Sequence, residues 1–186
     1  IDPVLVVPQA KIEVAADEAG ISIESWPVVD TEHSHAAAEQ ACMLAVNGEV
    51  DALMKGSLHS GELLGAVVHN NKLRTERRIT HVYAMDVRTY HKPFLLSDAA
   101  INIDPDLSAK QDIVDNTIKL WHALHDNSDL PKVAILAAVE TVNPGMQATI
   151  DAACLCKMTD RGQIDNAVMD GPLAFDNAIS KHAANE

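Results

Sequence analysis

Aromatic and sulfhydryl side chains are scarce in this sequence. Phenylalanine, tyrosine and tryptophan make up only 3% of the 186 residues, so a core has to be packed from Ala, Val, Ile, Leu and Met. The three cysteines, Cys42, Cys154 and Cys156, are an odd number without the CxxC spacing of a metal site. Because each stands in an apolar helical context, we expect reduced, buried thiols. Lys157 and Arg161 leave a reactive Cys156 open as an alternative.

Long hydrophobic runs are missing as well. No apolar stretch approaches the roughly 20 residues of a membrane span, and the N-terminus lacks the charged-then-apolar pattern of a secretion signal. We therefore expect a cytoplasmic protein with no membrane partner. The nine histidines show no pattern typical of metal ligands, since His33 and His35 would not share a helix face, while His122 and His125 stand on a helix where capping is commoner. We expect no metal.

Positive charge is the third scarcity. There are 14 Lys and Arg residues against 27 Asp and Glu, which gives a formal net charge of -13. Because nucleic-acid backbones are bound by excess positive charge, we expect no nucleic-acid partner. An anionic small molecule has to be attracted locally, and the one dense basic cluster lies within seven positions and consists of Lys72, Arg74, Arg77 and Arg78.

What the sequence does contain is a regular alternation of strand-like and helix-like segments. The predicted strands are 3–7, 26–29, 50–54, 81–86, 93–97, 132–139 and 166–169, and the predicted helices are 9–19, 34–46, 62–69, 108–125 and 146–158. This alternation is typical of a parallel α/β/α sheet with right-handed crossovers. The polar segment 70–78 has few apolar residues. We place a boundary there, between a first α/β domain at 1–75 and a second at 76–186.

Polar side chains follow several of the predicted strands. In an open parallel sheet each strand is buried and delivers its C-terminal loop to one common edge, where such folds bind ligands. We therefore expect a shared site at that edge. Its candidate residues are Asp86, Ser97, Asp98, Asn102, Glu140, Thr141, Asn143, Asp170, Asp176 and Asn177.

Each candidate has a structural alternative. The segment from Lys55 to Ser60 could cradle a phosphate, because Gly56 allows close backbone approach and a helix N-terminus follows; it could equally be a plain turn with Ser60 as N-cap. Arg74 could clamp phosphate oxygens through its planar guanidinium, or it could be a solvated charge. Short polar side chains such as Asp98 also cap helices and stabilise loops.

A series of segments then carries a family resemblance. In chain order they are ALMKGSLHSGELLGAVV, LRTERRITHVYAMDV, FLLSDAAINIDPDLSAKQDIVDNTIKL, AILAAVETVNP, TIDAACLCKMTDRGQI and MDGPLAFDNAIS. Together they resemble the phosphate acetyltransferase and phosphate butyryltransferase family over nearly the whole chain. The stretches HSHAAA and ALMKGSLHS look most like a subgroup in which this domain follows an enoyl-CoA hydratase-like module.

The resemblance implies a fold and an activity. It implies the two-domain architecture of the isopropylmalate dehydrogenases, incomplete here, and a homodimer. It also implies reversible transfer of an acetyl or butyryl group between coenzyme A and inorganic phosphate in one ternary complex, with acyl-CoA as substrate and no tightly bound cofactor. The implied substrate-binding residues are Arg74, Ser57, His59, Ser97, Asp98, Asn143 and Asp170.

Known family members are longer, and we expect this chain to lack material at both ends. The late serine and arginine that the family uses in catalysis have no matching residues here, so the resemblance assigns no catalytic residue. A second hypothesis is therefore a shortened, non-catalytic domain that binds phosphate or acyl-CoA. A dehydrogenase is a weaker third, because no GxGxxG follows a strand.

Overall fold

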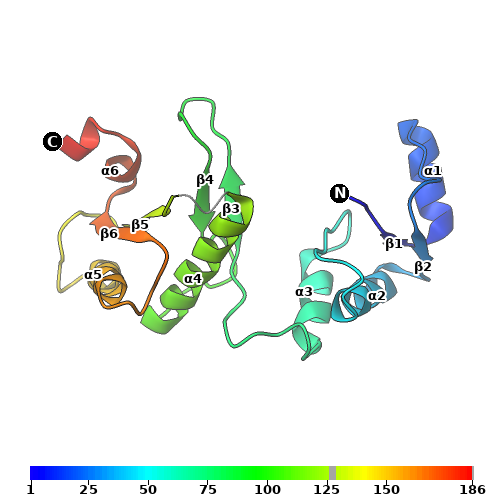
Figure 1. Ribbon diagram of the computed structural model, residues 1–186, viewed down its shortest axis with the longest axis horizontal. Helices are drawn as coiled ribbons and strands as arrows, with labels where there is room; N and C mark the ends of the chain where they lie inside the picture. The colour runs from blue at the N-terminus through cyan, green and yellow to red at the C-terminus, as the bar shows by residue number, and fades with distance from the viewer. Residues whose placement is uncertain (126–128, 186) are drawn as a thin grey trace. The chain divides into compact units, whose positions relative to one another are not determined.

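The chain forms two compact units, Ile1–Glu76 and Arg77–Glu186 (Figure 1). A computed structural model describes residues 1–125 and 129–185, and each unit is described by itself. Both units mix helices with short strands, which confirms the predicted α/β class. Within the described residues, no helix is both long and apolar enough to cross a membrane.

The first unit is built on a short parallel strand pair. Strand β1 (Leu5–Val7) pairs with β2 (Val28–Asp30), and helices α1 (Gln9–Ala19), α2 (Ser34–Val46) and α3 (Ser60–His69) complete the unit. Gly20 ends α1 in the left-handed conformation, at φ +66°, which glycine adopts without steric cost. The buried side chains Ala16, Ala38 and Cys42 are small, as expected for a core with few aromatic rings.

The second unit contains two strand pairs around two long helices. Strands β3 (Val82–Met85) and β4 (Phe94–Ser97) form an antiparallel hairpin, and β5 (Lys132–Leu136) pairs in parallel with β6 (Val168–Leu173). Helix α4 (Leu107–Leu124) packs on β4, and α5 (Gln147–Asp160) packs on β5, β6 and α4 (Figure 1). The short helix α6 (Phe175–Ile179) and a 3₁₀ turn (Ala183–Asn185) follow.

The core of the second unit covers one face of the β5–β6 sheet. Val114 and Ile118 of α4 and Leu155 of α5 form the buried cluster, and Val133 and Ile135 pack against it. Side chains along a strand point to opposite faces, and on the other face Lys132, Ala134 and Leu136 of β5 and Val168 and Asp170 of β6 are exposed. The prediction of strands buried on both faces is therefore wrong for this pair.

Several predicted strand features differ in the structure, and β5 ends at Leu136 rather than at the predicted Val139. Residues 50–54 are not a strand, and Met54 is 98% exposed. Strands β3 and β4 are antiparallel because only eight residues join them, too few for the crossover that parallel pairing needs. Strand β6 continues past the predicted end at Met169, through Gly171 and the buried Pro172, because Ala137 N–H donates to the Leu173 carbonyl at 2.9 Å.

Replacing Gly171 by alanine is expected to destabilise the second unit. A Cβ atom there would lie 2.8 Å from both Cβ and the carbonyl oxygen of Ile135 on the neighbouring strand. Such overpacking costs about 1–3 kcal/mol. Urea denaturation should show this loss for Gly171→Ala.

The matched control is Gly65→Ala in α3, where nothing lies within 4 Å of the added Cβ. There the same substitution should leave stability unchanged or raise it by about 0.5–1 kcal/mol, because alanine is the better helix former. Equal destabilisation by both substitutions would contradict the packing explanation.

Candidate functional site

The structure distributes the seven predicted binding residues over both units. Ser57, His59 and Arg74 belong to the first unit, and Ser97, Asp98, Asn143 and Asp170 belong to the second. Within the first unit, Ser57 and His59 precede α3, whereas Arg74 follows it. The ten residues of α3, which span about 15 Å, separate these positions along the chain.

The loop before α3 is held by its own side chains. The N-cap is His59 rather than the predicted Ser60, and its N–H donates to Glu62 Oε2 at 3.2 Å. Glu62 Oε1 also accepts from the Ser34 hydroxyl at 3.1 Å, and Lys55 Nζ donates to the Leu58 carbonyl at 3.1 Å. The exposed Ser57 and His59 side chains are therefore the groups that this loop offers to a ligand, and a phosphate would meet the Glu62 carboxylate beside them.

The basic cluster divides into anchored and unanchored members. The Arg77 guanidinium donates to Asn116 Oδ1 at 3.4 Å. Arg78 is tied to α4 only by its backbone, whose N–H donates to Asp112 Oδ2 at 3.2 Å, and its guanidinium makes no hydrogen bond within the described residues. In addition, Asn116 Nδ2 donates to the Arg78 carbonyl at 2.9 Å. Arg74 is exposed, and its guanidinium makes no hydrogen bond or ion pair within 1–125 and 129–185. This leaves Arg74 available to hold an anion, the role that the resemblance implies.

Asp98 organises its own loop. Its carboxylate accepts from the N–H groups of Ala100 and Ile101, at 3.0 and 3.1 Å, and from both the backbone and the side chain of Asn102. Ser97, which precedes it, donates its hydroxyl to the His81 carbonyl at 3.2 Å. Burial raises the pKa of Asp98, but these hydrogen bonds outweigh it and hold that pKa below its ordinary value. The contacts favour the loop-stabilising alternative for Asp98.

We expect Asp98→Asn to destabilise the protein at pH 7 and to have a smaller effect at pH 3. A carboxylate whose folded pKa is lowered contributes stability above its unfolded pKa of about 3.9. That contribution is lost as the pH falls through the folded pKa. Urea denaturation at the two pH values measures it. A difference between Asp98→Asn and wild type that does not change with pH would contradict the electrostatic explanation.

Asn143 lies in the loop between β5 and α5, and its backbone is held from both sides. Its N–H donates to Thr149 Oγ1 at 2.9 Å, and its carbonyl lies 3.1 Å from the same hydroxyl. Its side-chain Oδ1 accepts from the Gly145 N–H at 2.9 Å. The exposed Nδ2 donates no hydrogen bond within the part of the chain that the structure describes, so the loop presents a free amide donor.

Asp170 is on β6, not in the loop that follows it. It stands opposite Ala134 of β5, on the exposed face of the sheet, and its Oδ1 accepts from the Gly171 N–H at 2.9 Å. The predicted position at the strand end is therefore wrong, because β6 is longer than its sequence pattern indicates. Of the other candidates after β6, Asp176 and Asn177 belong to α6, and Asn177 Nδ2 donates to the Ala183 carbonyl at 3.2 Å.

The cysteines are free thiols, with Cys42 buried and Cys154 and Cys156 only half-buried, less than predicted. Cys156 Sγ donates to the Gly171 carbonyl at 3.6 Å. Burial raises the pKa of Cys156, and the carboxylates of Asp170 and Asp160 raise it further. Because the thiolate is the nucleophile, a raised pKa argues against the reactive-thiol alternative.

Two polar residues of α5 were missed in the sequence. Thr149 is 0% exposed, and Asp151 is 5% exposed and bound by Lys110 Nζ of α4 at 2.5 Å and by Gln147 Nε2 at 2.8 Å. The sequence did contain a sign of them, because Thr149 and Asp151 are polar residues in a helix that is otherwise rich in apolar residues. Periodicity alone does not separate buried polar positions from solvated ones.

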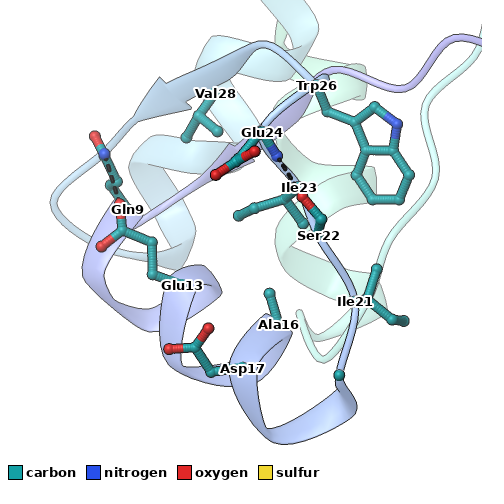
Figure 2. Close-up of a pocket in the computed structure, with 11 residues that line it drawn as sticks. Gln9, Glu13, Ala16, Asp17, Ile21, Ser22, Ile23, Glu24, Trp26 and Val28 are labelled. Atoms are coloured by element: carbon teal, nitrogen blue, oxygen red, sulfur yellow. Dashed lines mark hydrogen bonds between the residues drawn. The ribbon is translucent and has the colours of Figure 1, made fainter.

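One hollow in the described part of the chain lies elsewhere. It is a space of about 610 Å³ in the first unit, between α1 and the segment before β2 (Figure 2). Its lining includes the carboxylates of Glu13, Asp17 and Glu24 and no lysine or arginine, and none of the seven predicted binding residues lines it. Its charge does not suit an anionic ligand.

Comparison with known proteins identifies the class. Residues 28–186 match the family described as Phosphate acetyl/butaryl transferase. The chain is 55% identical to a phosphate acetyltransferase of Rickettsia felis, over 99% of this chain and 53% of that protein. It is 38% identical to a phosphate butyryltransferase of Clostridium acetobutylicum, over 99% of this chain and 61% of that protein.

A solved structure agrees with these sequence matches. A branched-chain phosphotransacylase from Enterococcus faecalis V583 superposes with a TM-score of 0.71 at 27% identity, covering 88% of this chain and 58% of that one. The chain therefore belongs to the phosphate acetyl/butyryl transferase family, as its motifs indicated. It spans about half the length of the acetyltransferase relative.

Proposed function

We propose that this protein is a phosphate acyltransferase, which moves a short acyl group between coenzyme A and inorganic phosphate. The observation that carries the proposal is the 55% identity to a phosphate acetyltransferase over 99% of the chain. The 38% identity to a butyryltransferase supports the same reaction class with a different acyl length. The thioester is already electrophilic, so the reaction needs no tightly bound cofactor and no metal.

The reaction is direct transfer in a ternary complex. A phosphate oxygen attacks the thioester carbonyl carbon, a carbon–oxygen bond forms, the carbon–sulfur bond breaks, and coenzyme A leaves as a thiolate that takes up a proton. The protein aligns two anionic substrates and stabilises the oxyanion. The raised pKa of Cys156 argues against an acyl-enzyme intermediate on that thiol.

Arg74 is the proposed phosphate clamp, because its free guanidinium carries several donors in one plane. The side chains of Ser57, His59 and Asn143 are the proposed neutral donors. The Ser97 hydroxyl already donates to the His81 carbonyl and the Asp98 carboxylate accepts from its own loop, so Ser97 and Asp98 are proposed to shape the loop that meets the phosphate. Asp170 is proposed to position the phosphate or to take its proton, because its exposed carboxylate is free of any cationic partner within the described residues.

The test is phosphate-dependent release of coenzyme A by the 186-residue chain. With acetyl-CoA or butyryl-CoA and inorganic phosphate, we expect one free thiol and one acyl phosphate per turnover. A thiol-reactive dye measures the first product and ³¹P NMR the second. Thiol release that does not depend on phosphate would instead indicate thioester hydrolysis and would contradict the proposal.

A second candidate is a binding domain without turnover, the alternative that the sequence left open. It would bind phosphate or acyl-CoA without releasing thiol. Isothermal titration calorimetry with phosphate and with coenzyme A, run beside the turnover assay, distinguishes the two candidates. Saturable binding with no acyl phosphate formed selects the second.

We also propose a cytoplasmic homodimer. The three free cysteines support a reducing compartment. Exposed apolar side chains on the second unit, including Leu136, Val168 and Phe175, support self-association. Sedimentation velocity should give twice the 20.0 kDa mass of one chain, and cell fractionation tests the location.

A further inference from the structure

The hydroxyl of Thr149 joins the start of α5 to the loop that carries Asn143. Thr149 is the third residue of α5 and is fully buried, at 0% exposure. It accepts from the Asn143 N–H at 2.9 Å, and its own proton is shared between the carbonyls of Asn143 and Met146, at 3.1 and 2.8 Å. One side chain therefore fixes both polar groups of the Asn143 backbone.

The side chain of Asn143 is oriented by a second contact. Because the Gly145 N–H donates to Oδ1 at 2.9 Å, the amide oxygen faces its own loop. The other half of the carboxamide, Nδ2, is then the outward group, and it can only donate. A donor held in one direction on an exposed loop suits an anionic oxygen, such as that of a phosphate.

The base of this arrangement is rigid. Asp151 lies in the same first turns of α5, is 5% exposed, and is bound by Lys110 from α4 and by Gln147 from α5. These bonds hold the N-terminal end of α5 against α4. Because Thr149 is held in the core, its hydrogen bonds fix the backbone of Asn143 on the surface.

We propose that Thr149 is a positioning residue, which aims Asn143 Nδ2 at a phosphate oxygen of the substrate. This inference rests on the proposed function, since it takes phosphate as the ligand. Thr149 itself does not touch the substrate. Its hydroxyl acts through the backbone of Asn143, together with the Gly145 N–H that orients the side chain.

The test follows the Asn143 side-chain amide by NMR while inorganic phosphate is added to the 186-residue chain. We compare wild type with Thr149→Val, which keeps the shape and removes the hydroxyl, and with Thr149→Ser, which keeps the hydroxyl. Losing one net hydrogen bond corresponds to about a 10-fold change in Kd. We expect a saturable shift in wild type, a Kd near wild type for Thr149→Ser, and a Kd about 10-fold higher for Thr149→Val.

The matched control is Thr159→Val, at the other end of the same helix. The Thr159 hydroxyl bonds the Leu155 carbonyl of its own helix at 3.2 Å, so this variant should bind phosphate like wild type. The double variant Thr149→Val/Asn143→Ala, followed by calorimetry, should bind no more weakly than Asn143→Ala, because Thr149 acts through Asn143. Additive losses would overturn the inference.

If Thr149→Val does not fold, Thr149→Cys gives a second test. It replaces the hydroxyl by a thiol, which is only a weak hydrogen-bond donor and acceptor, so it should also raise the phosphate Kd. Equal affinity in wild type, Thr149→Val and Thr149→Cys would overturn the inference while leaving thiol release, and so the proposed function, intact. The absence of any phosphate-induced shift at Asn143 would overturn it too, whether or not the chain turns over.

Discussion

Replacing Arg74 by alanine should lower kcat/KM for phosphate by about 100-fold, because a charged, two-pronged contact to phosphate is worth about 1.5–3 kcal/mol. Arg74 is exposed, and its guanidinium has no hydrogen-bonding partner within residues 1–125 and 129–185. Its removal should therefore leave folding unchanged. Arg74→Lys keeps the charge but not the planar fork, so it should recover only part of the loss. Thiol release at varied phosphate concentrations measures the effect.

The control for Arg74 is Arg88→Ala. Arg88 is an exposed arginine in the loop between β3 and β4, so this variant has the same net charge as Arg74→Ala. We expect it to change kcat/KM by less than about 2-fold, the scale of a screened surface charge. If the two variants lose activity equally, each arginine contributes only a non-specific positive electrostatic potential that attracts the anionic substrates. If Arg74→Ala retains full activity, Arg74 does not bind phosphate.

Replacing Lys110 by methionine should destabilise the second unit by about 3–5 kcal/mol, because it leaves the Asp151 carboxylate buried with only Gln147 as partner. Asp151 is 5% exposed, and Lys110 Nζ lies 2.5 Å from its Oδ2. Burial raises the pKa of Asp151, but the bonds from Lys110 and Gln147 outweigh it and lower that pKa. Urea denaturation at pH 7 measures the loss.

The same pair predicts a pH dependence. Because the folded pKa of Asp151 is lowered, its contribution is present above its unfolded pKa of about 3.9 and is lost as the pH falls through the folded value. The difference between wild type and Lys110→Met should therefore shrink between pH 5 and pH 2.5. An undiminished difference at pH 2.5 would mean that Lys110 stabilises through packing of its methylene groups instead.

An exposed ion pair on α5, the helix that carries Asp151, provides a comparison for the buried Lys110–Asp151 pair. Lys157 Nζ lies 2.7 Å from Asp160 Oδ2, but both side chains are solvated. Exposed pairs contribute little, because water and salt screen them. Lys157→Met should therefore leave the urea midpoint nearly unchanged. A loss as large as that of Lys110→Met would show that burial is not what separates the two pairs.

The elements with strong local signals were predicted most closely. The helices at 9–19 and 34–46 have the predicted bounds, since Gly20 and the Asn47-Gly48 pair stop them by local backbone chemistry. The β3–β4 hairpin was predicted as two strands but not as an antiparallel pair. That pairing follows from the short connection between them, a length that the predicted bounds already contained.

The roles of the candidate site residues stay predictions. Among the described residues, the Arg74 guanidinium has no partner and the Asn143 amide oxygen faces its own loop, so both roles are left to the experiments proposed above. Asp98 and Asp170 show the limit of reading a site from strand ends. The carboxylate of Asp98 is engaged by its own loop, and Asp170 lies within β6, because hydrogen bonds to neighbouring segments decide both positions.

The sequence by itself determined the family, the α/β class and the ends of the best-capped helices, because these depend on the order of motifs and on contacts between residues close in the chain. Tertiary structure alone decided that β5 pairs with β6, how far β6 extends, and which polar side chains of α5 are buried. The physical reason is that strand pairing and the burial of Thr149 and Asp151 depend on contacts between distant segments. The Lys110–Asp151 pair joins residues 41 positions apart, a separation that no local pattern encodes.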